Sequence, residues 1–249
     1  MKLTKDKGRV RHNFDMASNT YENFSSVQYQ SAEKLCKKLL YYFPNLSPNT
    51  VLDLGAGTGF MTQLLYKGFP NSNYTVNDIS PAMLKKAKKK LHNDVKFICG
   101  DMEILNFAFY DLVVSNLALQ WINNLNEMLK KICKNSRYFA FTCLLKGSFQ
   151  RLSDIFQDLS LIPPTYQYPS QKEVESFITS ISIKKFAFDI EEITIEMPSA
   201  LDLFKYFRYI GANTPNYHHS ISKLLKVVRN HNYSIKINYK IFFGFIQNK

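Results

Sequence analysis

One nonapeptide constrains the fold more than any other part of this 249-residue chain. Residues 51–59 read Val-Leu-Asp-Leu-Gly-Ala-Gly-Thr-Gly, a short β-branched and leucine run that leads directly into three glycines at alternate positions. A helical pattern of apolar residues follows from Phe60 to about Lys67. The order of strand, glycine turn and helix predicts a site where a ligand meets backbone at a helix N-terminus, at the carboxyl edge of a parallel sheet.

The same alternation continues to about residue 147. Ser80 and Pro81 supply an N-cap and a first-turn proline for the second helix of the series. Alternating strands and helices indicate a parallel sheet that is covered on both faces. We therefore expect an α/β fold of Rossmann-like type with a mostly parallel, twisted sheet. The further strands are expected at 73–77, 95–99, 110–115 and 137–144, and the further helices at 81–92 and 126–134.

The segments on either side of this core complete a single domain. Residues 1–13 read as a basic arm that we expect to be frayed, and residues 14–45 as an amphipathic helical region that ends at Pro44. No low-complexity linker follows the core of residues 50–146, so residues 147–235 are interpreted as its elaboration. A strand over residues 236–246 is expected to close the sheet. Within the last third we expect helices at 148–161, 170–181, 201–209 and 220–230, and strands at 183–188 and 233–246.

Composition excludes several classes of protein. The chain is 45% hydrophobic and 21% charged, which is typical of a globular protein rather than a disordered or fibrous one. Its apolar stretches fall far short of the roughly 18 residues that span a bilayer, and no apolar run of the secretory kind follows Met1. We therefore expect a cytoplasmic protein. The four cysteines and five histidines show no metal-ligand spacing, so no metal site is expected.

The glycine spacing and a neighbouring acid distinguish between two cofactor classes. A nicotinamide dinucleotide favours G-x-G-x-x-G, whereas this chain has G-x-G-x-G with Phe60 at the next position. Asp53 precedes the turn, where a carboxylate repels a pyrophosphate but suits the ammonium or sulfonium group of S-adenosylmethionine. Asp78, about 20 residues further on, is placed to accept hydrogen bonds from ribose hydroxyls. Asp101, after the third strand, is placed to accept one from an adenine amino group.

Three ordered motifs resemble those of class I S-adenosylmethionine-dependent methyltransferases. They are the nonapeptide with its three glycines, Asn77-Asp78-Ile79-Ser80-Pro81-Ala82-Met83-Leu84, and Gly100-Asp101-Met102-Glu103. Four further stretches resemble the malonyl-acyl-carrier-protein O-methyltransferases of biotin synthesis. They are Phe14-x-x-Ala17-x-x-x-Tyr21 with Gln28, the run from Val113 to Trp121, Gly211-Ala212-Asn213 preceded by Arg208, and residues 237–244. The match covers the chain from about Phe14 to its C-terminus.

This resemblance implies methyl transfer from S-adenosylmethionine to the free carboxylate of a malonyl thioester, on acyl carrier protein or coenzyme A. Arg208 is the expected clamp for that carboxylate and Tyr21 a catalytic lid residue. The substrate pocket is expected to contain Phe14, Gln28, Gln120 and Trp121. The residues expected to bind the cofactor are Asp53, Gly55, Ala56, Gly57, Gly59, Asp78, Ile79, Met83, Asp101, Met102 and Asn116.

The net charge of +12 is consistent with an acidic protein substrate. Acyl carrier proteins are acidic and carry a phosphopantetheine arm, so a basic rim around the site favours their docking. We expect a monomer that binds neither nucleic acid nor membrane. The basic residues expected at the rim are Lys5, Lys7, Arg9, Arg11, Arg151, Lys205 and Arg208.

Three other functions remain open on the sequence. The positive charge also suits a methyltransferase that acts on RNA, although Ser115-Asn116-Leu117-Ala118 stands where such enzymes carry an N-P-P-Y-type tetrapeptide. A methyltransferase-like assembly factor for respiratory complex I has a similar pattern, but those relatives tend to carry His at the position of Gln120. A scaffold that binds the cofactor without catalysis is disfavoured by the intact glycine and acid motifs.

Overall fold

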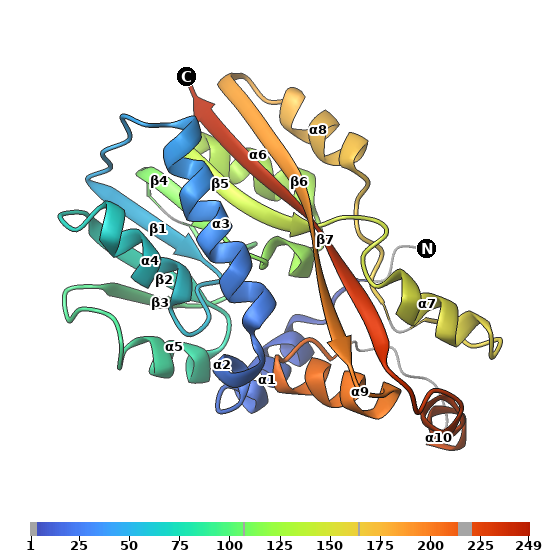
Figure 1. The fold of residues 1–249 in the computed structure, drawn as a ribbon. Coiled ribbons are helices and arrows are strands. Elements are labelled where there is room, and N and C mark those ends of the chain that lie inside the picture. The colour runs from blue at the N-terminus through green and yellow to red at the C-terminus, as the bar shows by residue number, and fades with distance from the viewer. Residues whose placement is uncertain (1–3, 107, 164, 214–220) are drawn as a thin grey trace.

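The computed structural model describes residues 4–106, 108–163, 165–213 and 221–249. Its described strands form one twisted sheet in the order β3-β2-β1-β4-β5-β7-β6 (Figure 1). The first five strands in the chain run parallel, and β7 is antiparallel to both of its neighbours. The strands are β1 (Thr50–Leu54), β2 (Asn73–Asp78), β3 (Lys96–Cys99), β4 (Tyr110–Ser115), β5 (Ser136–Leu144), β6 (Ile183–Met197) and β7 (Ile235–Asn248).

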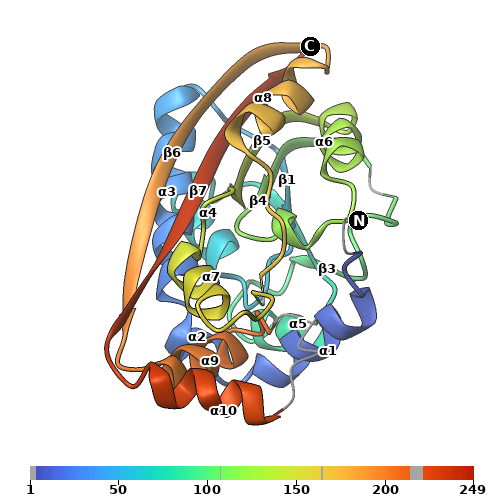
Figure 2. The same cartoon turned by 90° about the vertical axis from the view of Figure 1, so that its right-hand side faces the viewer.

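Helices cover both faces of the sheet (Figures 1 and 2). One apolar cluster holds buried residues of α3, α4, α5, α7 and α9, and the other holds buried residues of α6 and α8. Both clusters include side chains of β1, because successive residues of a strand point to opposite faces. The expected Rossmann-like α/β architecture is confirmed. The helices are α1 (Lys7–Ala17), α2 (Tyr21–Phe24), α3 (Ser26–Tyr42), α4 (Phe60–Gly68), α5 (Pro81–Ala87), η1 (Leu119–Trp121), α6 (Leu125–Lys134), α7 (Gln150–Gln157), α8 (Gln171–Thr179), α9 (Ala200–Tyr209) and α10 (Ile221–Asn230). In the described part of the chain, no helix combines the length and apolarity needed to cross a membrane.

The strand order reverses beside β1. From β1 the chain adds β2 and β3 on one side, and it then crosses to place β4 and β5 on the other. Such a reversal leaves a crevice at the carboxyl ends of the strands, which is where ligands bind in open α/β sheets. The glycine turn of residues 55–59 follows β1 and therefore lies at this crevice.

The expectation of a frayed N-terminal arm is wrong for the described residues 4–13. Helix α1 begins at Lys7, because the Asp6 side chain caps it by accepting a hydrogen bond from the Arg9 backbone N–H at 3.1 Å. The ammonium groups of Lys5 and Lys7 also donate to the carbonyls of Ile122 and Trp121. Two parts of the expected segments, residues 1–3 of the arm and Ser220 at the start of the last helix, lie outside the described residues.

Among the remaining boundaries, the ends of α5 and β6 differ most from expectation. Helix α5 starts as predicted, with the Ser80 hydroxyl accepting from the Met83 N–H at 3.1 Å, but it ends at Ala87 rather than His92. Residues 88–90 continue as turns, in which the N–H groups of Lys89 and Lys90 donate to carbonyls three residues back. Strand β6 is the larger difference, since it extends nine residues beyond the expected end at Phe188 and reaches Met197.

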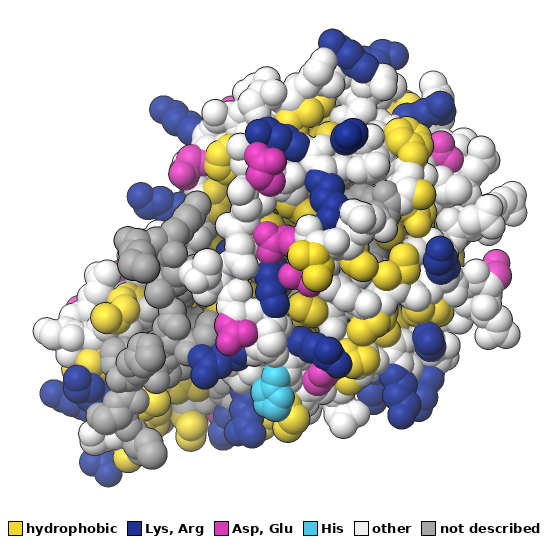
Figure 3. Space-filling model, turned by 180° about the vertical axis from the view of Figure 1, so that it is seen from behind, with side chains coloured by type: hydrophobic (Ala, Val, Ile, Leu, Met, Phe, Trp, Pro, Cys, Tyr) yellow, Lys and Arg dark blue, Asp and Glu magenta, His cyan; other side chains and the backbone are white. Residues whose placement is uncertain are grey.

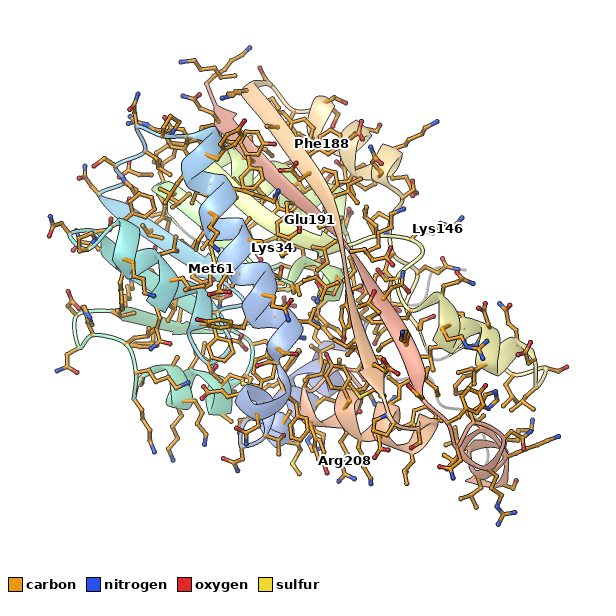
Figure 4. The ribbon with its side chains drawn as sticks, in the orientation of Figure 1. Lys34, Met61, Lys146, Phe188, Glu191 and Arg208 are labelled. Atoms are coloured by element: carbon orange, nitrogen blue, oxygen red, sulfur yellow. The ribbon has the colours of Figure 1, made fainter. Side chains whose placement is uncertain are left out.

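The extension of β6 has an identifiable cause in its charges. Residues 189–197 mix apolar and acidic side chains on an edge strand, which is a composition that a half-exposed strand tolerates. Lys34 and Lys38 of α3 form ion pairs with Glu191, and Lys38 also pairs with Asp189 at 3.0 Å. Figure 4 shows Lys34 and Glu191 facing one another between helix and strand. These ion pairs offset the repulsion between the acids and hold the second half of β6 against α3.

Candidate functional site

The glycine turn brings backbone close to a cavity. Gly55, Gly57 and Gly59 all have positive φ, at 73°, 56° and 89°, so other residues would be strained there. A Cβ on Gly55 would lie 2.4 Å from the Cβ of Ala118, which shows that the turn packs directly on the segment after β4. A Cβ on Gly57 would meet no atom within 4 Å. Gly57 therefore leaves open space above the turn.

Asp78 connects the glycine turn to helix α5. One carboxylate oxygen accepts from the Gly57 N–H at 2.8 Å, and the other accepts from the Ser80 N–H at 2.8 Å. Burial raises the pKa of Asp78 to about 6, although these two backbone hydrogen bonds act in the opposite direction. The carboxylate thus shapes the turn as well as lying at its mouth.

Asp53 lies behind the turn and is almost fully buried. One of its oxygens accepts from the Thr62 hydroxyl at 2.7 Å, and the other has no hydrogen-bond partner among the described residues. Burial raises its pKa to about 7, with a smaller contribution from the charge of Asp78. An unpaired buried carboxylate oxygen costs free energy unless a cation or a donor reaches it.

A cavity beside the turn gathers most of the residues expected to bind the cofactor. Those that line it are Gly55, Gly57, Asp78, Ile79, Met83, Asp101, Met102 and Asn116. Asp53, Ala56 and Gly59 are outside its lining: Asp53 lies in β1 and the other two within the turn itself. The mixture of two carboxylates, an amide and apolar side chains around an open glycine fits a nucleoside that carries a cationic amino-acid end. We call this space the cofactor-side cavity.

Helix α1 closes over the cofactor-side cavity. At one end of the helix the Lys7 ammonium lies 2.5 Å from Glu103 and 3.5 Å from Asp101. At the other end an Asp15 carboxylate oxygen accepts from the Ser80 hydroxyl at 2.6 Å. The cavity measures about 60 Å³, which is room for a few water molecules rather than a nucleoside. Entry of the cofactor therefore requires movement of α1 or of the side chains beneath it.

Asn116 joins the end of β4 to two neighbouring elements. Its amide oxygen accepts from the hydroxyls of Ser31 at 2.7 Å and Thr142 at 3.0 Å, and its nitrogen donates to the carbonyl of Gln28 at 2.9 Å. These bonds occupy the side chain, so it links α3 and β5 to the floor of the cavity. The expected contact with the methionine part of the cofactor stays a prediction.

A second, largely aromatic cavity of about 220 Å³ adjoins the first, and we call it the acceptor cavity. Phe14, Tyr21, Gln28, Gln120 and Trp121, the residues expected to form the lid and the substrate pocket, all line it. The rings of Phe14 and Trp121 meet edge to face with centroids 5.4 Å apart. Phe14, Tyr21, Leu117 and Trp121 line both cavities, so the two spaces meet at these four side chains.

Arg208 is the expected residue that the structure does not bring to the site. It is exposed on α9 and is absent from the described linings of both cavities (Figure 4). Phe204 and Phe207 present the inner side of the same helix to the acceptor cavity. The described lining of that cavity contains no Lys or Arg, so it offers only neutral donors.

Several functional candidates were missed from the sequence. Tyr206 and Tyr239 form a buried hydroxyl pair at 2.8 Å, and Tyr239 lines the acceptor cavity. Burial raises the pKa of Tyr206 to about 12, and it raises that of Tyr21 further. Leu117 has a φ of 45°, an uncommon value for a branched residue, at the junction of the two cavities. Leu117 and Tyr239 lie in stretches that carry the family resemblance, but no local spacing predicts their roles, because distant segments bring them to the site.

Comparisons with known proteins agree with this geometry. A family model described as a methyltransferase domain matches residues 51–137. The fold is similar to magnesium protoporphyrin IX methyltransferase from Synechocystis PCC 6803 with bound SAH, at a TM-score of 0.60 and 16% identity over 98% of this chain and all of that one. It is also similar to the plantazolicin methyltransferase in complex with SAH, at a TM-score of 0.58 and 16% identity over 98% and 96% of the two chains.

Two curated relatives settle the family. The malonyl-[acyl-carrier protein] O-methyltransferase of Neorickettsia risticii is 33% identical over 237 residues, which is 95% of each chain. The protein of the same name from Priestia megaterium is 31% identical over 85% of this chain and 83% of its own. The chain belongs to the malonyl-[acyl-carrier protein] O-methyltransferase family, and it is an S-adenosylmethionine-dependent methyltransferase of class I, as its motifs predict.

Proposed function

We propose that this chain methylates the free carboxylate of a malonyl thioester carried by acyl carrier protein, giving the methyl ester that serves biotin synthesis. The observation that carries the proposal is the direct junction between the cofactor-side cavity and the aromatic acceptor cavity. The names of the relatives support the choice of acceptor. S-adenosylmethionine, when bound, supplies the methyl group on a sulfonium centre.

The acceptor explains why the site needs no general base. A carboxylic acid is already ionised at pH 7 and is itself the nucleophile. The tyrosines of the acceptor cavity remain protonated, since burial raises the pKa of Tyr21, Tyr168 and Tyr239. An apolar wall also suits a reaction that joins a cation and an anion into neutral products, because buried charge is costly. The chain's task is then to orient the acceptor and exclude water.

We assign the cofactor contacts to the residues gathered beside the glycine turn. Asp78 is proposed to accept from the ribose hydroxyls and Asp101 from the adenine amino group, with Ile79 and Met83 against the ring. Both acids line the cofactor-side cavity and Met83 is fully buried there. The unpaired oxygen of Asp53 supports a role in stabilising the cationic end from behind the turn.

The second oxygen of the acceptor carboxylate is proposed to be held by neutral donors rather than by Arg208. Tyr21 supports this assignment because it lines both cavities and carries a protonated hydroxyl. Removing that hydroxyl should lower turnover without weakening cofactor binding. Arg208 keeps a role only in docking the carrier, on the exposed side of α9.

We place this activity in a cytoplasmic monomer, since both proposed substrates are dissolved molecules. A monomer would have the mass of one chain, 29.0 kDa, in light scattering. A mass of two chains that persists on dilution would replace the monomer with a dimer.

Mass spectrometry of the carrier tests the function. The purified protein, S-adenosylmethionine and malonyl-acyl carrier protein are incubated together, and the intact mass of the carrier should rise by one methylene. Acetyl-acyl carrier protein, which has no free carboxylate, should show no gain. No gain on the malonyl carrier, together with cofactor binding in calorimetry, would reject the acceptor and retain the enzyme class.

A further inference from the structure

A polar groove continues the acceptor cavity to the surface. Its volume is about 510 Å³, and its lining comes from residues 119–126, from the end of β5 and the segment that follows it, and from α8 and the segment before it. Gln120, Leu144, Thr165, Tyr166 and Tyr168 line both spaces. The glycine turn, the acceptor cavity and this groove therefore form one path that opens where β5 leads into α7.

The groove carries buried hydrogen-bonding atoms without partners among the described residues. The amide oxygens of Gln120 and Asn126 and the hydroxyl of Tyr166 are buried and unpaired among the described residues. Tyr166 as a residue is only 8% exposed. An unpaired buried polar atom is costly, so a ligand that offers N–H donors here gains affinity. Two unpaired amide oxygens in one groove suit a ligand that itself contains amide N–H groups.

The outer part of the groove is positively charged. Lys146 is exposed on the loop after β5, where its backbone N–H donates to the Pro169 carbonyl at 2.8 Å (Figure 4). Lys5 lies further in, where its ammonium donates to the Ile122 carbonyl at 2.6 Å and lies 5.6 Å from the centre of the Tyr166 ring. The acidic residue in the lining, Glu173, accepts hydrogen bonds from Ser170 in the capping box of α8. The mouth therefore favours an anion.

We propose that this groove binds the phosphopantetheine arm of the malonyl thioester, with the arm's amide N–H groups on Gln120 and Asn126 and its phosphate near Lys146. The aromatic cavity, the unpaired amide oxygens and the exposed Lys146 offer partners for the thioester, the amides and the phosphate of the arm. The inference rests on the proposed function and extends it to the direction of entry. It places the carrier over the loop between β5 and α7.

Substrates of graded length test the assignment. Malonyl-acyl carrier protein and malonyl-coenzyme A both carry the phosphate, whereas malonyl-pantetheine keeps the amides and lacks it. Lys146→Glu should raise KM about tenfold for the two phosphorylated thioesters and leave KM for malonyl-pantetheine unchanged, because only they lose a charge-assisted contact. Lys37→Glu, an equal charge reversal at an exposed position of α3, should change none of the three.

Asn126→Leu tests the amide part of the path independently. It removes the unpaired oxygen at similar volume, so KM should rise severalfold for all three thioesters while the Kd for S-adenosylmethionine stays at the wild-type value. Equal KM values for wild type and both groove variants on every thioester would overturn the proposal. If a rise for Lys146→Glu occurred with the carrier alone and not with coenzyme A, the residue would contact the carrier protein instead of the phosphate, and the proposal would also fail. Failure of the proposed function would look different, because the wild-type protein would then methylate none of the three thioesters.

Discussion

At the scale of single residues, Asp53 of β1 and Asp78 of β2 have different roles. Asp53 is sealed behind the glycine turn with one unpaired oxygen, whereas Asp78 binds the turn and faces the cofactor-side cavity. Both carry raised pKa values because both are buried. Removing the charge of Asp78 should therefore lower the affinity for the cofactor, whereas removing that of Asp53 should change the stability of the fold.

Asp78→Asn should weaken cofactor binding. The charged acceptor for Gly57 and for the ribose hydroxyls is lost, and hydrogen bonds to charged groups are worth about 1.5–3 kcal/mol, which corresponds to a Kd raised about tenfold or more. Calorimetry with adenosine and 2′,3′-dideoxyadenosine identifies the contact, because only adenosine should lose affinity if the ribose hydroxyls are bound. Equal losses for the two nucleosides would show that Asp78 acts through the turn alone.

Asp53→Asn should change how stability depends on pH. The folded protein holds the Asp53 carboxyl at a pKa of about 7, above the roughly 3.9 of an unfolded chain. The stabilisation from its proton is therefore complete below pH 4 and lost as pH rises toward 7. The free energy of unfolding of Asp53→Asn minus that of wild type should increase by roughly 2–4 kcal/mol between pH 4 and 8. Urea denaturation measures it, with Asp94→Asn at an exposed position as the control; parallel curves would contradict it.

The sequence predicted the cofactor side of the site more fully than the acceptor side. Gly57, Asp78 and Asp101 belong to local strand-end motifs, and the structure gathers them because parallel strands share a carboxyl edge. The acceptor cavity is built from α1, α9 and β7, which are far apart in the chain. Its Tyr239 reads as one residue of an alternating strand, and only tertiary packing brings it to Tyr206.

At the scale of elements, the lid depends on a close contact between α1 and the end of α9. Gly211 follows α9 with a φ of +69°, and a Cβ there would lie 2.8 Å from the Phe14 ring and 3.1 Å from its Cα. The Thr20 hydroxyl also donates to the Tyr209 carbonyl at 2.9 Å. The C-terminal elaboration thus holds the N-terminal lid helix over the site.

Gly211→Ala should loosen that lid. The methyl group meets Phe14, and the left-handed backbone costs a non-glycine residue about 1–2 kcal/mol, so the free energy of unfolding should fall by at least that amount. Hydrogen exchange should become faster across α1, measured by mass spectrometry of its peptides. Gly68→Ala is the matched control, since its Cβ would lie 4.0 Å from Leu40 in a helix and should be neutral or stabilising. Unchanged exchange in α1 would mean that the lid does not rely on this contact.

Element boundaries show where local patterns fail. The parallel core was predicted closely, because β1 and β4 are short apolar runs bounded by turns. The start of α1 was missed because Lys7 and Arg9 read as a charged arm, and the ion pair of Lys7 with Glu103 is a long-range contact. The second half of β6 was missed for the same reason, since the partners of Asp189 and Glu191 lie on α3.

At the scale of the whole molecule, the net charge of +12 acts on an acidic carrier before any contact forms. Figure 3 shows lysine and arginine side chains spread over one face, with acidic side chains between them, rather than one continuous basic patch. Several of the basic residues expected at the rim are already engaged within the protein. They are Lys7 with Glu103, Arg11 with Asp15, Lys205 with Asp202, and Arg151 with the Tyr233 hydroxyl.

A distributed charge of this kind should raise the rate at which the carrier associates more than it prolongs the bound complex. The kcat/KM for malonyl-acyl carrier protein should fall about tenfold between 50 and 500 mM salt, because screening shortens the reach of exposed charges, while that for malonyl-pantetheine should change little. Charge reversal of Arg151 and Arg208 together should raise KM for the carrier and spare the coenzyme A thioester. Steady-state kinetics at several salt concentrations measures both effects. Equal salt slopes for the carrier and for malonyl-pantetheine would mean that the positive surface has no part in recognising the carrier, and that the buried path alone selects the substrate.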